Sequence, residues 1–314
     1  MNALDYQALV SMFTGQPKDT PLFSDYAWKW YRRYKEPTIR PNTRRLYEGF
    51  LSNHLVPYFG EKPVGSITSG DVQDFYDSRG DLAHSTARQL KVVLHQIMAS
   101  AIEDQLICTN PTESKRHVLP DRVTERNALT KAEIQDVIRQ LPRLKEQDLL
   151  LLGLLIYTGE RRGEAIGLRW EDIDFRISLI HVRRAVIHIG NRPIVTDPKS
   201  KAGIRDIPLL PELKKILTEH RRRTGYIIGD GVSPITETSF CRRWERIDRL
   251  IDLHGATPHV FRHTFLTMAS DGIDTKTLQA IAGHSTYTLT FNRYVHKRDE
   301  KIRESASKLQ GLFA

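Results

Sequence analysis

Charged and histidine side chains lie three residues apart in two short segments, one of which could contact phosphate. Arg161 and Glu164 lie three residues apart in TGERRGEAIG, so they share a helix face on which the carboxylate orients the guanidinium group. His259 and Arg262 have the same spacing and follow Pro258 at an expected helix start, where free backbone N–H groups attract phosphate. Each pair taken alone is equally typical of a surface ion pair or a chance match. At such a helix start Arg262 could add a bidentate fork to phosphate oxygens.

Two further segments carry lysine, histidine and tyrosine side chains that a hydrophobic core does not require. Lys199 and Lys201 lie in PKSKAGIRDIPL, on an expected β-hairpin. His284 follows Gly283 at an expected helix end, and Tyr294 comes ten residues after His284. A tyrosine hydroxyl, with a reference pKa of about 10, is a poor nucleophile at neutral pH unless positive charge and a base surround it. Composition alone does not select Tyr294, because the chain has 11 tyrosines and most buried tyrosines simply pack with their hydroxyl satisfied.

Helical periodicity and turn signals organise the residues before these segments into an all-helical region. From residue 23 to about 111, apolar side chains recur at spacings of three and four. Thr68 and Asp71, flanked by Ile67 and Val72, predict a capping box with a hydrophobic staple for a helix over 70–78. Other helices are expected from about 43 to the 57–60 turn, and from 85 or 86 to a point before 110. One buried helical face at the start of the region is predicted for Tyr26, Ala27, Trp30, Tyr31 and Tyr34.

A second region begins after a polar, basic segment over 112–128 that is predicted to be a linker. Thr130 and Glu133 repeat the capping-box pattern. The run DLLLLGLLIYTG is apolar on nearly every side and predicts a buried central helix. Alternation over 177–182, 185–189 and 204–209, with a turn at Gly190–Asn191, predicts a small β insert within about 172–209. Helices are expected again at 211–220, 236–251, 259–271 and 275–283.

The expected fold is therefore mainly α. A short N-terminal segment, 1–22, precedes a helical domain over 23–111, and the linker leads to an α-helical domain over 129–314 with a small antiparallel β-sheet insert. The last residues, from about 299, have apolar side chains at helical spacing and predict a terminal helix.

Composition narrows the class of protein. The 47 Lys and Arg residues exceed the 38 Asp and Glu residues and give a net charge of +9, which favours nucleic acid as a partner. Cys108 and Cys241 lie too far apart to form a CxxC-type pair, which argues against a disulfide framework or a cysteine-rich metal site. The N-terminus lacks a signal-peptide pattern, and the longest apolar run, 149–157, is shorter than the ~20 residues that span a bilayer. We expect a cytoplasmic protein without a membrane partner.

The motifs, taken together and in this order, resemble those of the tyrosine recombinase family, the phage-type integrases. TGERRGEAIGLRWEDID is similar to the family's arginine box, PKSKAGIRDIPL to its lysine hairpin, TPHVFRHTF to its HxxR box, and AGHSTYTLTFNRYVH to its GH and nucleophile box. The resemblance covers 129–296, and residues 23–111 resemble more weakly the SAM-like core-binding domain that precedes the catalytic domain in the family. Glu160 departs from the pattern, because the family usually has an apolar residue at that position.

The resemblance implies a site-specific DNA recombinase that needs neither metal nor cofactor. It would cut and rejoin double-stranded DNA through a 3′-phosphotyrosyl intermediate and a Holliday junction. The implied catalytic residues are Tyr294 as nucleophile, Arg161 and Arg262 as phosphate clamp, His259 as proton acceptor or phosphate contact, Lys199 or else Lys201 as proton donor to the leaving oxygen, His284 as phosphate contact and Glu164 as support.

The resemblance also implies partners. A homotetramer on two DNA duplexes is expected, joined by the terminal helix docking in trans, with DNA-bending or excision factors as further partners. Basic residues expected to bind DNA are Arg40, Arg44, Arg45, Lys115 and Arg116. The integrase of a phage or an integrative transposable element fits best. The alternatives are an Xer-type resolvase of chromosome dimers, a catalytically silent DNA-binding relative and a type IB topoisomerase.

Overall fold

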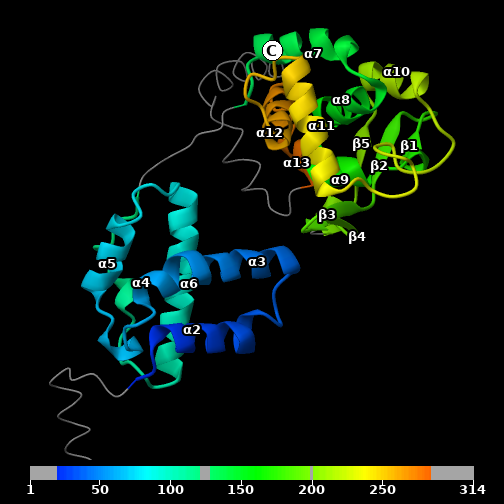
Figure 1. Ribbon diagram of the computed structural model, residues 1–314. Coiled ribbons are helices and arrows are strands. Elements are labelled where there is room, and N and C mark those ends of the chain that lie inside the picture. The colour runs from blue at the N-terminus through cyan, green and yellow to red at the C-terminus, as the bar shows by residue number, and fades with distance from the viewer. Residues whose placement is uncertain (1–19, 121–127, 199–200, 284–314) are drawn as a thin grey trace, which may run out of the picture. The chain divides into compact units, whose positions relative to one another are not determined.

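The computed structural model describes residues 20–120, 128–198 and 201–283, without the side chain of Lys201 (Figure 1). The chain divides into two compact units, residues 1–125 and 126–314, and each unit has its own hydrophobic core. Within the described residues no helix is both long and apolar enough to cross a membrane.

The first unit is built from helices. An aromatic cluster lies at its centre, where the ring centroid of Phe59 is 5.5 Å from that of Phe23 and 5.2 Å from that of Phe75. All three rings are fully buried. The helices around this cluster are α2 (Phe23–Trp30), α3 (Pro41–Phe50), α4 (Val56–Phe59), α5 (Ser69–Asp77) and α6 (His84–Glu103), with π-helical turns at Tyr31–Lys35 and Leu51–Leu55.

Local signals place the starts of α3, α5 and α6 to within two residues. The capping box at α5 is confirmed, because Thr68 Oγ1 accepts the N–H of Asp71 and the Asp71 carboxylate accepts the N–H of Thr68. The predicted buried face is wrong at Tyr34, which is 45% exposed. Tyr34 lies in the π-helical turn, whose i to i+5 bonding changes the angular spacing of side chains and moves this ring off the face.

The expected linker begins later than its composition indicates. Thr112 is buried and its N–H donates to Asn110 Oδ1 at 3.0 Å, while Val118 N donates to Gln73 Oε1 at 2.9 Å. His117 Nε2 lies 2.9 Å from the hydroxyl of Ser69. Residues 112–120 therefore contact the first unit. The contacts described are polar, so they do not require apolar residues at regular spacing in the sequence.

The second unit surrounds one buried helix. Every residue of α8 (Glu146–Thr158) from Leu150 onward is buried, as the apolar run predicts. This helix contacts α9, α10, α11 and α12. Helices of the second unit besides α8 are α7 (Lys131–Gln140), α9 (Arg162–Gly167), α10 (Pro211–Glu219), α11 (Glu237–Leu250), α12 (Pro258–Ala269) and α13 (Thr275–Ala282).

Two small antiparallel sheets follow α9, so the fold is mainly α with a β insert, as predicted. β2 (Leu179–Val182) lies between β1 (Ile173–Asp174) and β5 (Arg205–Pro208), and β3 (Ala185–Ile189) pairs with β4 (Arg192–Thr196) across the predicted turn (Figure 1). The expected lysine hairpin is wrong, because β4 and β5 pair with different neighbours. Residues 197–204 connect the two sheets, and Lys201 begins a 3-10 turn, Lys201–Gly203, within that connection.

Candidate active site

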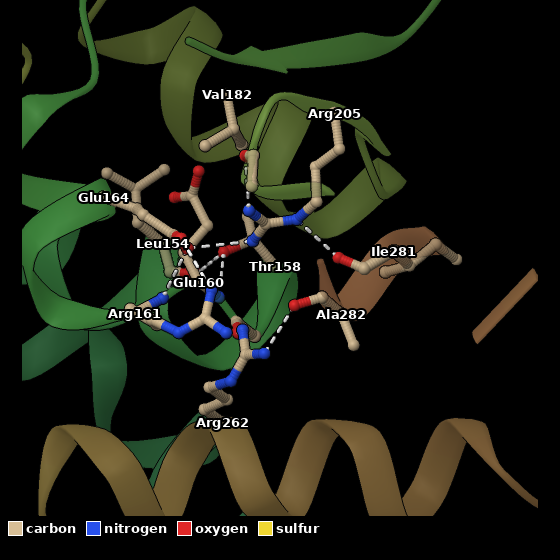
Figure 2. A network of polar contacts seen from close by, with 12 residues as sticks. Leu154, Thr158, Glu160, Arg161, Glu164, Val182, Arg205, Arg262, Ile281 and Ala282 are labelled. Carbon is tan, nitrogen blue, oxygen red and sulfur yellow. Dashed lines mark hydrogen bonds and ion pairs between the residues drawn. The ribbon is translucent and has the colours of Figure 1, made fainter. Parts of the chain in front are cut away.

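The first arginine pair lies where α8 ends and α9 begins. Gly159, with φ +61°, ends α8 in the left-handed conformation, and Arg161 is the residue before the first turn of α9. Glu164 accepts the backbone N–H of Arg161 at 3.0 Å and a guanidinium N–H of the same residue at 2.8 Å (Figure 2). The Arg161 side chain remains 45% exposed, so its guanidinium group is oriented by Glu164 and still accessible to a ligand.

Glu164 is a buried carboxylate that two arginines keep ionised. Its side chain is 4% exposed, and Arg205, whose side chain is 5% exposed, donates to its second oxygen at 2.9 Å. Burial alone would raise the pKa of Glu164. The hydrogen bond and charge of Arg205, together with Arg161, outweigh burial and lower the pKa of Glu164 to about 2.

The second arginine of the sequence pattern connects the ends of two helices. Arg262 lies in α12 and is 3% exposed. Its Nη1 donates to the carbonyl of Gly159 at 2.8 Å, and its Nη2 donates to the carbonyl of Ala282, in the last turn of α13, at 2.5 Å. The structure therefore brings Arg161 and Arg262 to the same helix junction around Gly159, although they lie about 100 residues apart in the sequence.

These bonds to backbone carbonyls are not indicated by the position of Arg262 near the start of a helix. The sequence pattern predicts that the Arg262 guanidinium group binds phosphate oxygens. In the structure two nitrogens of this group donate to backbone carbonyls. The carbonyl ends of helices carry partial negative charge, which suits a buried guanidinium group. His259 lies one turn earlier in α12 and is exposed.

Glu160 lies between the glycine and the arginine of this junction. It is completely buried, and neither carboxylate oxygen has a well-aligned hydrogen-bond partner among the described residues. Burial, followed by the charge of nearby Glu164, raises the pKa of Glu160 to about 8, so the side chain holds a proton at neutral pH. The departure from the family pattern thus places a neutral acid at this junction, and burial of the neutral form costs less than burial of the charged carboxylate.

Several residues of the sequence pattern cannot be placed in this junction. Lys199, His284 and Tyr294 lie outside the described residues, as does the helix expected from about 299. In the first unit Arg40, Arg45, Lys115 and Arg116 are exposed, and Arg44 donates through Nε to the carbonyl of Ile39 at 3.2 Å. Among the described side chains, no cluster of His, Cys, Asp and Glu has the arrangement of a metal site.

Sequence reasoning missed Arg205, although a signal for it exists. In β5, Arg205 and Ile207 are buried and the residues between and after them are exposed. The strand pattern therefore puts a charged side chain at an inward-facing position, where it needs buried partners. The alternation over 204–209 predicts the strand, and the inward-facing position of Arg205 follows from the same alternation.

A mainly helical fold in two units, with an Arg-x-x-Glu pair and an His-x-x-Arg pair joined at the end of a buried helix, defines a tyrosine-type recombinase. The family model described as the phage integrase family matches residues 127–301, and the phage integrase N-terminal SAM-like domain matches residues 22–78. The chain belongs to the phage integrase family and is a site-specific DNA recombinase.

Relatives and solved structures agree with this assignment. The chain is 28% identical over 299 residues to the integrase of Mycobacterium phage L5, covering 91% of this chain and 78% of the phage protein. It is 26% identical over 328 residues to a XerC-like tyrosine recombinase of Caldanaerobacter subterraneus, covering 92% and 83%. The fold matches the Tn1549 transposon integrase in complex with circular intermediate DNA, with a TM-score of 0.77 and 23% identity over 92% of this chain and 100% of that one. It also matches a lambda integrase tetramer bound to a Holliday junction, with a TM-score of 0.66 and 17% identity, covering 94% and 87%.

Proposed function

We propose that this recombinase is the integrase of a phage or an integrative transposable element and that Tyr294 is its nucleophile. The tyrosine oxygen would form a bond to the scissile phosphorus while the bond from phosphorus to the 5′-oxygen breaks. The 5′-oxygen would leave with a proton, and a 5′-hydroxyl from the partner duplex would later attack the phosphotyrosine in the reverse sense. The phosphoester bond is thereby conserved without metal or cofactor.

The observation that carries this proposal is the meeting of Arg161 and Arg262 at the end of α8. Two guanidinium groups at one junction are suited to the negative charge that develops on a phosphate in the transition state. Arg161 keeps an accessible side chain, and its ion pair with Glu164 fixes its orientation. Supports for Arg262 are the carbonyls of Gly159 and Ala282.

The remaining roles complete the proton transfers. His259, exposed in the first turn of α12, would accept the tyrosine proton or contact the phosphate. Lys199, or else Lys201, would protonate the leaving 5′-oxygen, and His284 would donate a hydrogen bond to the phosphate. Each of these assignments carries over the residue at the matching position of the family's motifs.

The test of the nucleophile is covalent capture. Incubation with a nicked suicide duplex carrying the element ends should give a protein–DNA adduct on a denaturing gel. Tyr294→Phe should bind the duplex and form no adduct. Tyr34→Phe is the matched control, because it removes a hydroxyl from an exposed tyrosine of the first unit. An adduct in Tyr294→Phe would refute the assignment, and no adduct in the wild-type chain would favour a catalytically silent DNA-binding protein.

We further propose a homotetramer on two duplexes, linked by the helix expected from about 299. The lambda integrase tetramer on a Holliday junction supports this assembly. In it residues 23–111 would serve as the core-binding domain and residues 129–314 as the catalytic domain, on cytoplasmic DNA with DNA-bending or excision factors. Deleting residues 303–314 should abolish recombination and spare binding to a single site. Unchanged recombination by the truncated chain would exclude the linking role.

An Xer-type resolvase is the second candidate, because a XerC-like recombinase is among the relatives. The two functions differ in their substrates. An element integrase joins the element ends to a target, whereas a resolvase recombines two copies of a chromosomal site. Recombination assays with both kinds of substrate separate them.

A further inference from the structure

Arg205 is a buried arginine that connects three segments of the second unit. It is the first residue of β5, and its side chain is 5% exposed. Nη2 donates to Glu164 Oε2 at 2.9 Å, and Nε donates to the carbonyl of Ile281 at 2.6 Å (Figure 2). Nη1 donates to the carbonyl of Gly203 at 3.1 Å. Each nitrogen of the guanidinium group therefore bonds to a different segment.

These three segments carry the residues of the proposed reaction. Glu164 orients Arg161. Gly203 is the last residue of the 3-10 turn Lys201–Gly203, and Lys201 lies two residues after Lys199. Ile281 lies in the last turn of α13, three residues before His284. One side chain thus links the arginine box to the backbone of the lysine-bearing connection and to the helix end that precedes His284.

The packing around Gly283 makes this link a close fit. Gly283 ends α13 with φ +62°, and a β-carbon on it would lie 2.9 Å from the carbonyl oxygen of Ala202 and 3.1 Å from Cδ and Nη1 of Arg205. Only a residue without a side chain fits between the turn and the arginine. The end of α13 is therefore seated directly on Arg205 and on the 201–203 turn.

Lysine cannot replace Arg205 in this arrangement. A guanidinium group is planar and directs five N–H donors outward in fixed directions, whereas a lysine ammonium is a single compact charge. A lysine at this position could keep the ion pair with Glu164 and would release at least one of the two carbonyls. The Arg205→Lys substitution therefore separates the charge of Arg205 from its ability to connect the segments.

We propose that Arg205 is a positioning residue for strand cleavage, holding the lysine-bearing turn and the end of α13 at Gly283 against the arginine box. It touches neither substrate nor the reacting atoms in this role. The inference rests on the proposed function, because the turn and the helix end matter for cleavage only if Lys199 or Lys201 and His284 act there.

The test compares Arg205→Lys with Arg184→Lys. Arg184 is the matched control, because it also pairs with a buried carboxylate, Asp172, and also donates to a carbonyl, that of Gly167. DNA affinity and the single-turnover cleavage rate are measured separately on the suicide duplex. Arg205→Lys should bind DNA within about threefold of wild type and cleave ~100-fold more slowly, the loss typical of a misplaced general acid. Arg184→Lys should cleave at the wild-type rate once bound.

A second substrate distinguishes positioning from general destabilisation. In a duplex with sulfur in place of the bridging 5′-oxygen, the leaving thiolate needs no proton, so a misplaced lysine matters less. The defect of Arg205→Lys should shrink about tenfold or more on this duplex, within the range that general acid catalysis contributes. An equal defect on both duplexes would contradict the positioning of the lysine turn.

Gly283→Ala keeps the proposal testable if Arg205→Lys does not fold. It leaves Arg205 and Glu164 intact and pushes the helix end away from them, and thermal unfolding checks that the variant is folded. It should bind DNA normally and cleave slowly. Normal cleavage by either folded variant overturns this inference alone, whereas a wild-type chain that forms no adduct overturns the proposed function and this inference with it.

Discussion

The buried acid Glu160 should make the stability of the second unit fall as pH rises. Its pKa of about 8 compares with 4.5 for an ordinary glutamate. Between these two values the folded chain holds a proton that the unfolded chain has released, so each increase in pH favours unfolding. The loss in the free energy of unfolding should approach ~1.4 kcal/mol per pH unit inside this window, or about 5 kcal/mol across it.

Glu164 does not obscure this effect, because its pKa is shifted in the opposite direction. Its lowered pKa of about 2 gives stability that is present above its ordinary value of 4.5 and is lost as pH falls toward 2. The two windows meet near pH 4.5 and do not overlap. Glu164 therefore contributes no change between pH 5 and 8, and a variant that differs only at residue 160 isolates the effect of Glu160 there.

The assay is urea unfolding of wild type and Glu160→Gln at pH 5, 6, 7 and 8. Glutamine resembles the protonated acid in shape and cannot ionise. The difference in unfolding free energy between the two chains cancels the groups that they share, and it should move in favour of the variant by ~1 kcal/mol per pH unit. The cleavage rate of wild type should also fall above pH 8, where a second carboxylate would compete for Arg205, and the variant should keep its rate. A difference that stays constant from pH 5 to 8 would refute the reasoning.

Three other expectations follow from contacts described above. Arg262→Ala should lower the single-turnover cleavage rate by ~10²–10³ with little loss of DNA affinity, as measured on the suicide duplex, because it removes a preorganised positive charge. Gly159→Ala should lower the free energy of unfolding, measured in urea, by ~1–3 kcal/mol, since its φ is +61° and the new β-carbon would lie 2.4 Å from Phe265. Arg45→Ala should weaken DNA binding uniformly across sequences and reduce the salt slope of the affinity by about one, whereas Arg139→Ala, which removes an arginine paired with Asp136, should leave the slope unchanged.

Features encoded by neighbouring residues could be predicted from the sequence. The capping boxes at Thr68 and Thr130 each need two residues three apart, and both are formed. The Arg161–Glu164 pair has the same spacing and is formed at 2.8 Å. Apolar residues on all sides of α8 predict that this helix is buried. In each case the physical cause lies within one or two helical turns.

Features that depend on distant partners could not be predicted. Arg205 bonds to Glu164 and Ile281, which lie 41 and 76 positions away, and the sequence of its own strand does not indicate these partners. The protonation of Glu160 depends on how completely the end of α8 is covered, which is a property of the packed unit. The partners of β4 and β5 are also set by the sheets as a whole, so a short connection between two strands was mistaken for a hairpin.

The last turn of α13 is held in place, so it limits how far the residues that follow it can extend. Arg205 binds the carbonyl of Ile281 and Arg262 binds that of Ala282, so this turn is tied to the arginine junction by two adjacent carbonyls. Eleven residues separate Gly283 from Tyr294, and a chain of that length spans at most about 40 Å. In the proposed reaction Tyr294 could therefore act only at an arginine clamp within about 40 Å of its own Gly283, whether that clamp belongs to its own subunit or to a neighbour. Exchange of the tyrosine between subunits would require the neighbour's clamp to lie within this distance.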